Sequence, residues 1–150
     1  MKKVLFAVAL LFGAFTASAQ VSVVKEAKGL KGKPEQAAKV LEAALTNPET
    51  ANDPETWKLA GDFQKAIYDA ENEKMYLSAV DKTKVADTAK MYNSLVKMFE
   101  YYMKCDEVEQ AGVANGTVKK AKLRKKNAET LLKVRSNLAN GGVEAFNENN

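Results

Sequence analysis

Histidine is missing from all 150 residues of the chain. Its absence excludes histidine general bases, Ser–His and Cys–His nucleophile pairs, and metal sites with histidine ligands. No glycine-rich phosphate loop is present either, because Gly141–Gly142 follows no strand and lacks the spaced lysine of such loops.

Paired carboxylates are the one catalytic arrangement that the composition leaves open. The acidic clusters that could supply them are Asp53/Glu55, Glu71/Glu73 and Asp106/Glu107/Glu109. We expect the first cluster to cap a helix and the other two to face water near helix ends. The sequence therefore predicts a protein that is not an enzyme, with no catalytic residue, metal site or cofactor.

Cysteine is almost absent as well, with Cys105 as the single example. A lone cysteine excludes an internal disulfide, so the fold must be held by packing alone. We expect this thiol to be buried among apolar neighbours, and the alternative is a reactive or intermolecular role.

Long apolar runs are missing after the first nineteen residues. Those residues combine Lys2 and Lys3, an apolar stretch over residues 4–15 and the A-x-A pattern Ala17–Ser18–Ala19. This pattern predicts a signal peptide over residues 1–19, since an apolar run of about twelve residues is shorter than the roughly 20 that span a bilayer. An uncleaved anchor is the alternative. We expect an exported product, periplasmic, outer-membrane-associated or secreted, with no transmembrane segment.

Residues 20–150 suit one helical domain, and no stretch alternates with a period of two. Apolar spacing predicts helices over residues 21–30, 35–45, 55–71, 85–108 and 118–146, with residues 75–77 as a possible extension of the third. Pro34, Asp53–Pro54 and Asn115–Gly116 are local start or turn signals, and Asn47–Pro48 is expected to end a helix. The predicted fold class is all-α, with about five helices.

One stretch resembles the junction between two tetratricopeptide repeats. That family places A-x3-[FL]-x2-A on a second helix and W-x2-L-G-x2-Y on the next first helix. The residues here that carry the pattern are Ala37, Leu41, Ala44, Trp57, Ala60 and Gly61, with Ala60 in the place of the leucine. Pro48 supplies the turn one residue early, and Gln64 stands where the family has its second aromatic. The resemblance implies antiparallel helical hairpins stacked as a short solenoid; another antiparallel helical bundle is the alternative.

A second glycine-bearing step follows near the end of the sequence, at Leu138, Gly141 and Gly142. Small residues at such steps let two helices approach closely. The resemblance implies that this step opens an incomplete last repeat, so that the chain could be the N-terminal part of a longer protein and could self-associate. A signal peptide before degenerate repeats is similar to exported repeat proteins of Bacteroidetes-type bacteria.

The expected function is a non-catalytic scaffold of the cell envelope or secreted fraction that binds a protein or peptide. The resemblance places Lys58, Asp62 and Lys65 on the concave face, and Tyr101 is a further candidate contact. The alternative is a stand-alone exported bundle that acts as an envelope chaperone or anionic-surface binder through the basic run at residues 119–126. We expect no nucleic-acid binding, because no aromatic is interleaved in that run.

Overall fold

The computed structural model describes the backbone of residues 22–30 and 32–148, and the side chains among these up to Gly141. The predicted signal peptide at residues 1–19 therefore lies outside the described part. Every regular element within that part is a helix, which confirms the all-α prediction. Residues 22–29 are helical, and the longer elements are α2 (Pro34–Thr46), α3 (Pro48–Ala51), α4 (Pro54–Leu77), α5 (Thr88–Ala114) and α6 (Leu123–Glu148).

Most helix starts are fixed by capping side chains. Asp53 accepts a hydrogen bond from the backbone N–H of Glu55 at 3.0 Å, and Asp87 accepts one from Lys90 at 2.9 Å. The Asn47–Pro48 pair ends α2 as predicted, but it also starts the short helix α3, which the sequence analysis missed. Asn47 caps α3 by accepting from the N–H of Glu49 at 2.9 Å, with Pro48 at a position that needs no donor.

The two longest predicted helices have different bounds in the structure. Helix α5 starts at Thr88 and not at residue 85, because Asp87 is its N-cap. It continues past residue 108 to Ala114. Asn115 and Gly116 then form the predicted turn, and Gly116 has a φ of 80°. Helix α6 starts only at Leu123, since residues 115–122 form the connection.

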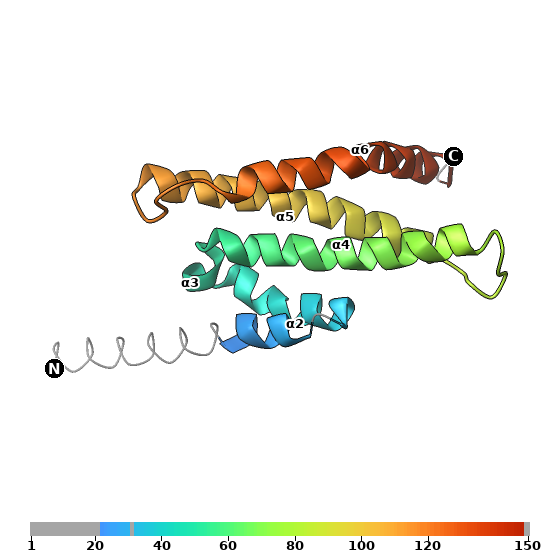
Figure 1. Ribbon diagram of the computed structural model, residues 1–150, viewed down its shortest axis with the longest axis horizontal. Helices are drawn as coiled ribbons and strands as arrows, with labels where there is room; N and C mark the ends of the chain where they lie inside the picture. Colours follow the sequence, from blue (N-terminus) through green and yellow to red (C-terminus); the bar gives the residue numbers. More distant parts are fainter. Residues whose placement is uncertain (1–21, 31, 149–150) are drawn as a thin grey trace.

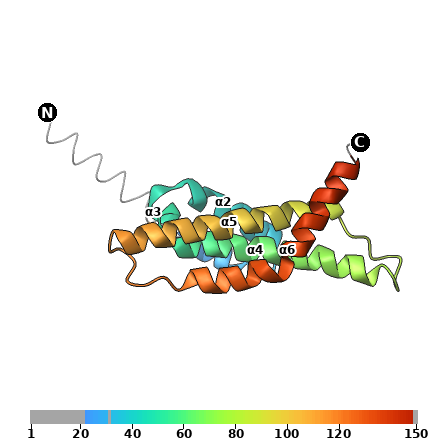
Figure 2. The same cartoon turned by 90° about the horizontal axis from the view of Figure 1, so that it is seen from above.

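Four helices lie side by side in the order α2, α4, α5, α6, and consecutive ones run antiparallel (Figure 1). Among the described helices, α4 and α5 share the most extensive interface. In the view from above, the C-terminal part of α6 crosses α5 at a steep angle (Figure 2).

Two apolar clusters hold these helices together. The first joins residues 22–30, α2 and α4, and its buried members are Ala27, Ala37, Leu41, Ala44, Ala60 and Phe63. The second joins α4 and α5 and is flanked by α6, and its buried members are Tyr68, Met91, Leu95, Met98 and Tyr102. Helix α4 takes part in both clusters and is therefore the central element.

Both glycine-bearing steps are close approaches between helices. A Cβ at Gly61 of α4 would overlap the ring of Tyr102 on α5, and a Cβ at Gly141 of α6 would overlap the ring of Tyr92 on α5. Leu138 packs against the second cluster, while the surroundings of Gly142 lie outside the described side chains. Glycine at these two steps lets an aromatic ring of α5 lie directly on a neighbouring backbone.

Candidate ligand-binding groove

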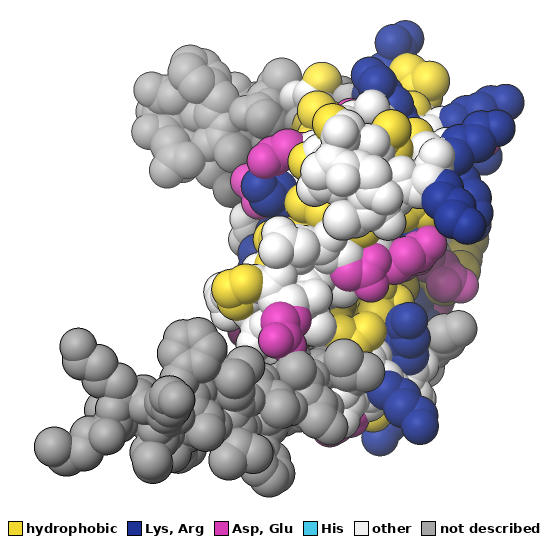
Figure 3. All heavy atoms as spheres, turned by 90° about the vertical axis from the view of Figure 1, so that its left-hand side faces the viewer, with side chains coloured by type: hydrophobic (Ala, Val, Ile, Leu, Met, Phe, Trp, Pro, Cys, Tyr) yellow, Lys and Arg dark blue, Asp and Glu magenta, His cyan; other side chains and the backbone are white. Residues whose placement is uncertain are grey.

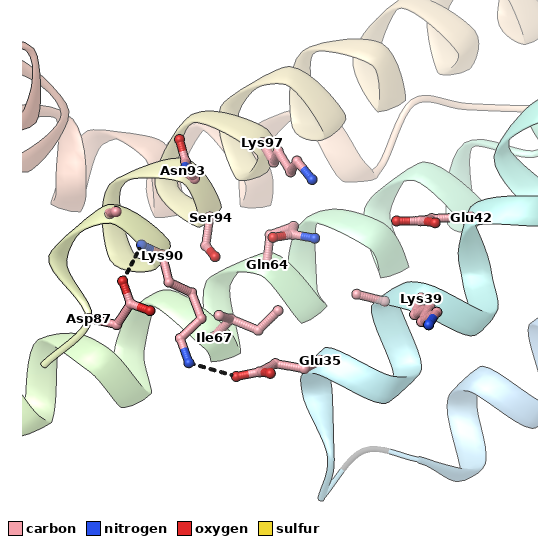
Figure 4. Close-up of a pocket in the computed structure, with 12 residues that line it drawn as sticks. Glu35, Lys39, Glu42, Gln64, Ile67, Asp87, Lys90, Asn93, Ser94 and Lys97 are labelled. Carbon is pink, nitrogen blue, oxygen red and sulfur yellow. Dashed lines mark hydrogen bonds and ion pairs between the residues drawn. The ribbon is translucent and has the colours of Figure 1, made fainter. Parts of the chain in front are cut away.

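An open groove runs between α2 and α5, with α4 as its floor (Figure 4). Its volume is about 520 Å³, within the range of small-ligand sites. The residues that line it are Glu35, Ala38, Lys39, Glu42, Gln64, Ile67, Asp87, Ala89, Lys90, Asn93, Ser94 and Lys97. Nine of these twelve side chains are polar or charged, while apolar atoms supply somewhat more than half of the lining surface, so the groove offers both kinds of contact to a ligand.

Gln64 on the floor and Ser94 on the α5 wall are buried polar residues of this groove. Gln64 is 8% exposed and Ser94 is 5% exposed. Within the described part of the chain, neither the Gln64 amide nor the Ser94 hydroxyl makes a hydrogen bond to another protein group. Figure 4 shows both side chains between the two walls. A buried polar group without a partner costs about 1–3 kcal/mol, so such groups in a folded protein need an explanation.

One end of the groove is closed by ion pairs. Lys90 on α5 lies 3.0 Å from Glu35 on α2 and 2.8 Å from Glu71 on α4. Burial alone would raise the pKa of Glu71, but hydrogen bonds from Lys74 and Lys90 lower it to about 2. The same carboxylates raise the pKa of Lys90. This network fixes the spacing of the three helices that form the groove.

The other end of the groove carries charges that have no such partner. Lys39 and Glu42 on α2 and Lys97 on α5 are exposed, and none of them forms an ion pair or side-chain hydrogen bond among the described residues. Figure 4 shows the first two on the α2 wall and Lys97 on the opposite wall. These three side chains are available to a ligand.

The contacts that the sequence analysis placed on α4 lie outside this groove. Lys58 pairs with Asp62, and Lys65 pairs with Asp69. Asp62 also accepts a hydrogen bond from the hydroxyl of Tyr102 at 2.8 Å. Burial, followed by the bond to Asp62, raises the pKa of Tyr102. Lys58, Asp62 and Lys65 stay a predicted contact surface, but their charges already have partners within α4.

Tyr101 lies apart from those three residues. Its ring packs against Trp57 with the two centroids 6.0 Å apart and the planes inclined by 51°. It also contacts the first apolar cluster, and Trp57 donates a hydrogen bond to the carbonyl of Ala51 at 2.6 Å. The half-buried Tyr101 thus joins α5 to α4, and its predicted role as a partner contact stays a prediction.

Two acidic residues that we expected to face water are in fact buried. Glu71 and Glu109 are each 2% exposed. Glu109 accepts hydrogen bonds from the backbone N–H groups of Lys122, Leu123 and Arg124, the start of α6, at 2.7–3.1 Å. The prediction was wrong because each carboxylate stabilises the start of the following helix, which shields it from water.

Basic side chains gather along one edge of the end of the molecule that includes the α5–α6 connection (Figure 3). The run at residues 119–126 lies in this connection and at the start of α6. Arg124 lies 3.5 Å from Asp106, and Lys125 lies 4.0 Å from Glu129. The other lysines of the run form no ion pair within the described residues, so the run presents a basic surface.

Two further candidates for chemistry are the lone cysteine and a metal site. Cys105 is fully buried, as expected, and burial raises the pKa of its thiol to about 11. Among the described residues, no group of three or more acidic or cysteine side chains is placed to hold a metal ion. No described helix combines the length and apolarity needed to cross a bilayer.

No protein-family model, curated protein or solved structure matches the chain.

Proposed function

We propose that this protein is a non-catalytic binding module that holds an extended polar peptide segment in the α2–α4–α5 groove. One observation supports the proposal above the others: Gln64 and Ser94 are buried at the groove, and their side-chain polar atoms have no partner among the described residues. A bound ligand that supplies hydrogen bonds would compensate for that burial.

The chemistry of the groove favours a peptide over other polar ligands. The Gln64 side chain carries both an amide donor and a carbonyl acceptor, the same two groups that a peptide bond offers. Ser94 can donate and accept as well, and Ile67 beside them offers apolar contact to a side chain. The chain has no histidine and its one cysteine is buried, which favours binding over catalysis.

Two further proposals accompany this function. We propose that the chain is a tetratricopeptide-like repeat protein, and the antiparallel order of α2, α4, α5 and α6 supports this (Figure 1). The close approach at Gly61 supports it too, because the family has glycine at that step.

We also propose export through the signal peptide at residues 1–19, for which the sequence pattern is the support.

A pair of apolar substitutions tests the groove. Gln64→Leu and Ser94→Ala remove the polar atoms while keeping most of the volume. Because no described protein group bonds to those atoms, we expect the double variant to fold with an unchanged or higher melting temperature. Peptides that bind the wild-type chain are first selected from a displayed library of random 12-residue sequences. Measured by fluorescence anisotropy, their affinity for the double variant should be at least tenfold weaker than for the wild type.

Gln36→Leu is the matched control, since Gln36 is an exposed glutamine on α2 outside the groove. This variant should bind the selected peptides as the wild type does. Equal binding by the double variant, or failure of the library to yield any peptide that the wild-type chain binds, would contradict the proposed function.

An anionic surface is the second candidate partner, through the exposed lysines of residues 119–126 (Figure 3). Binding through that run should weaken steeply as salt rises, whereas groove recognition should weaken less. Sedimentation with phosphatidylglycerol vesicles at low and high salt separates the two. Salt-sensitive sedimentation that survives the groove variants would favour the anionic surface.

A further inference from the structure

The two walls of the groove carry matching charges at matching intervals. Glu35 and Glu42 are seven residues apart on α2, and Lys90 and Lys97 are seven residues apart on α5. Seven residues span about 10 Å, or two turns, of an α-helix. The first acid–lysine pair, Glu35 with Lys90, is closed at 3.0 Å, while Glu42 and Lys97 form no ion pair with any described residue. An ion pair therefore joins the two walls at one end of the groove, and the other end is open.

The open end has an excess of positive charge. Three charged side chains at this end form no ion pair within the described part of the chain, Lys39 and Glu42 from α2 and Lys97 from α5, and their charges sum to one positive charge. Asp87 and Lys90 at the closed end are engaged, since Asp87 caps α5 and Lys90 pairs with two glutamates. Lys39 and Lys97 stand on opposite walls of the open end, and Glu42 lies on the α2 wall at the same end, so a ligand there faces one lysine on each wall (Figure 4).

We infer that the groove selects a peptide with a carboxylate side chain, which lies between Lys39 and Lys97 while the adjoining peptide group lies on Gln64. This inference rests on the proposed peptide-binding function and names the ligand class of the same site. Hydrogen bonds between ammonium and carboxylate groups are shorter and stronger than neutral ones, so an acid should be preferred over its amide. Glu42, beside the lysines, disfavours a second acidic side chain at that point.

Matched peptides provide the test. Two blocked pentapeptides that differ only in a central aspartate or asparagine are titrated into ¹⁵N-labelled full chain and followed by ¹H–¹⁵N NMR. We expect both to shift the signals of residues lining the groove, and the aspartate peptide to bind about tenfold more tightly, equivalent to about 1.4 kcal/mol. Lys97→Gln and Lys39→Gln should each reduce that preference to about threefold or less.

Lys133→Gln is the matched control, because Lys133 is an exposed lysine on α6 that does not line the groove. It should leave the preference for aspartate unchanged. Equal affinities for the two peptides, or a preference that survives both lysine substitutions, would overturn the inference and leave the proposed function in place. Absence of any shift at the groove with either peptide would contradict the proposed function itself.

Discussion

The α4–α5 and α5–α6 connections both bring a buried glutamate against the start of the next helix, yet they balance its charge differently. Glu71 accepts a backbone hydrogen bond from Asp87 at 3.0 Å and is neutralised by Lys74 and Lys90, each 2.8 Å away. Glu109 accepts only backbone hydrogen bonds, from residues 122–124, and no lysine or arginine lies within ion-pair distance of it among the described residues.

This difference shows two ways to keep a carboxylate in a helical interior. At Glu71, lysines from α4 and α5 supply the opposite charge, and one of them also reaches α2 through Glu35. At Glu109, the partial positive charge of a helix start takes the place of a cation. The first arrangement joins three helices, whereas the second only fixes where α6 begins.

The largest effect is expected at Glu71 and should depend on pH. A folded-state pKa of about 2 against the ordinary 4.5 makes the ionised carboxylate stabilising by about 3 kcal/mol. Because the pKa is lowered on folding, this contribution is complete above pH 4.5 and is lost as the pH falls toward 2. Urea unfolding of Glu71→Gln should show a loss of about 3 kcal/mol at pH 7 and a flatter dependence on pH below 4.5.

Glu73→Gln is the control for that experiment, since Glu73 is an exposed acid on the same helix. It should change the free energy of unfolding by less than about 0.5 kcal/mol. If Glu71→Gln kept the acid dependence of the wild type, the lysine pairs would not be what stabilises this carboxylate.

A smaller effect is expected at Glu109. Glu109→Gln keeps one acceptor oxygen but removes the charge that faces the start of α6, so we expect a loss of about 2 kcal/mol in unfolding free energy. Hydrogen exchange should accelerate at the amides of residues 122–124 more than elsewhere. Glu107→Gln, an exposed acid on the same turn of α5, is the control and should leave these amides unchanged. Unchanged hydrogen exchange in Glu109→Gln would mean that the charge of Glu109 does not stabilise the start of α6.

Local signals in the sequence were enough to predict most of the helix boundaries. Pro34, Asp53–Pro54 and Asn115–Gly116 mark the places where the structure starts or ends a helix. Such signals act within a few residues, because a capping side chain reaches only its own first turn. They missed α3 because one Asn–Pro pair can end one helix and cap the next.

The buried acids and the groove needed information that local signals lack. Glu71 lies four residues after Ile67, and Glu109 lies four after Cys105, so both continue an apolar stripe. Helical spacing could have indicated their burial, but their partners come from the next connection. Gln64 gave a similar signal, as a polar residue on the buried face of α4. Lys39 and Lys97 line the same groove because α2 and α5 both pack against α4, an arrangement that no local pattern specifies.

The smallest effect is expected at Gly116, and it concerns a second difference between the two connections. Gly116 is the only described residue with a positive φ, 80°, so the α5–α6 connection needs a left-handed residue and the α4–α5 connection does not. Gly116→Ala should lower the free energy of unfolding by about 1 kcal/mol, and Gly116→Asn by less, because asparagine tolerates this conformation. Gly29→Ala is the control: its backbone φ is not positive and no atom crowds its Cβ, so thermal unfolding should show no loss. Equal losses for alanine and asparagine at position 116 would mean that the left-handed backbone is not what this connection requires.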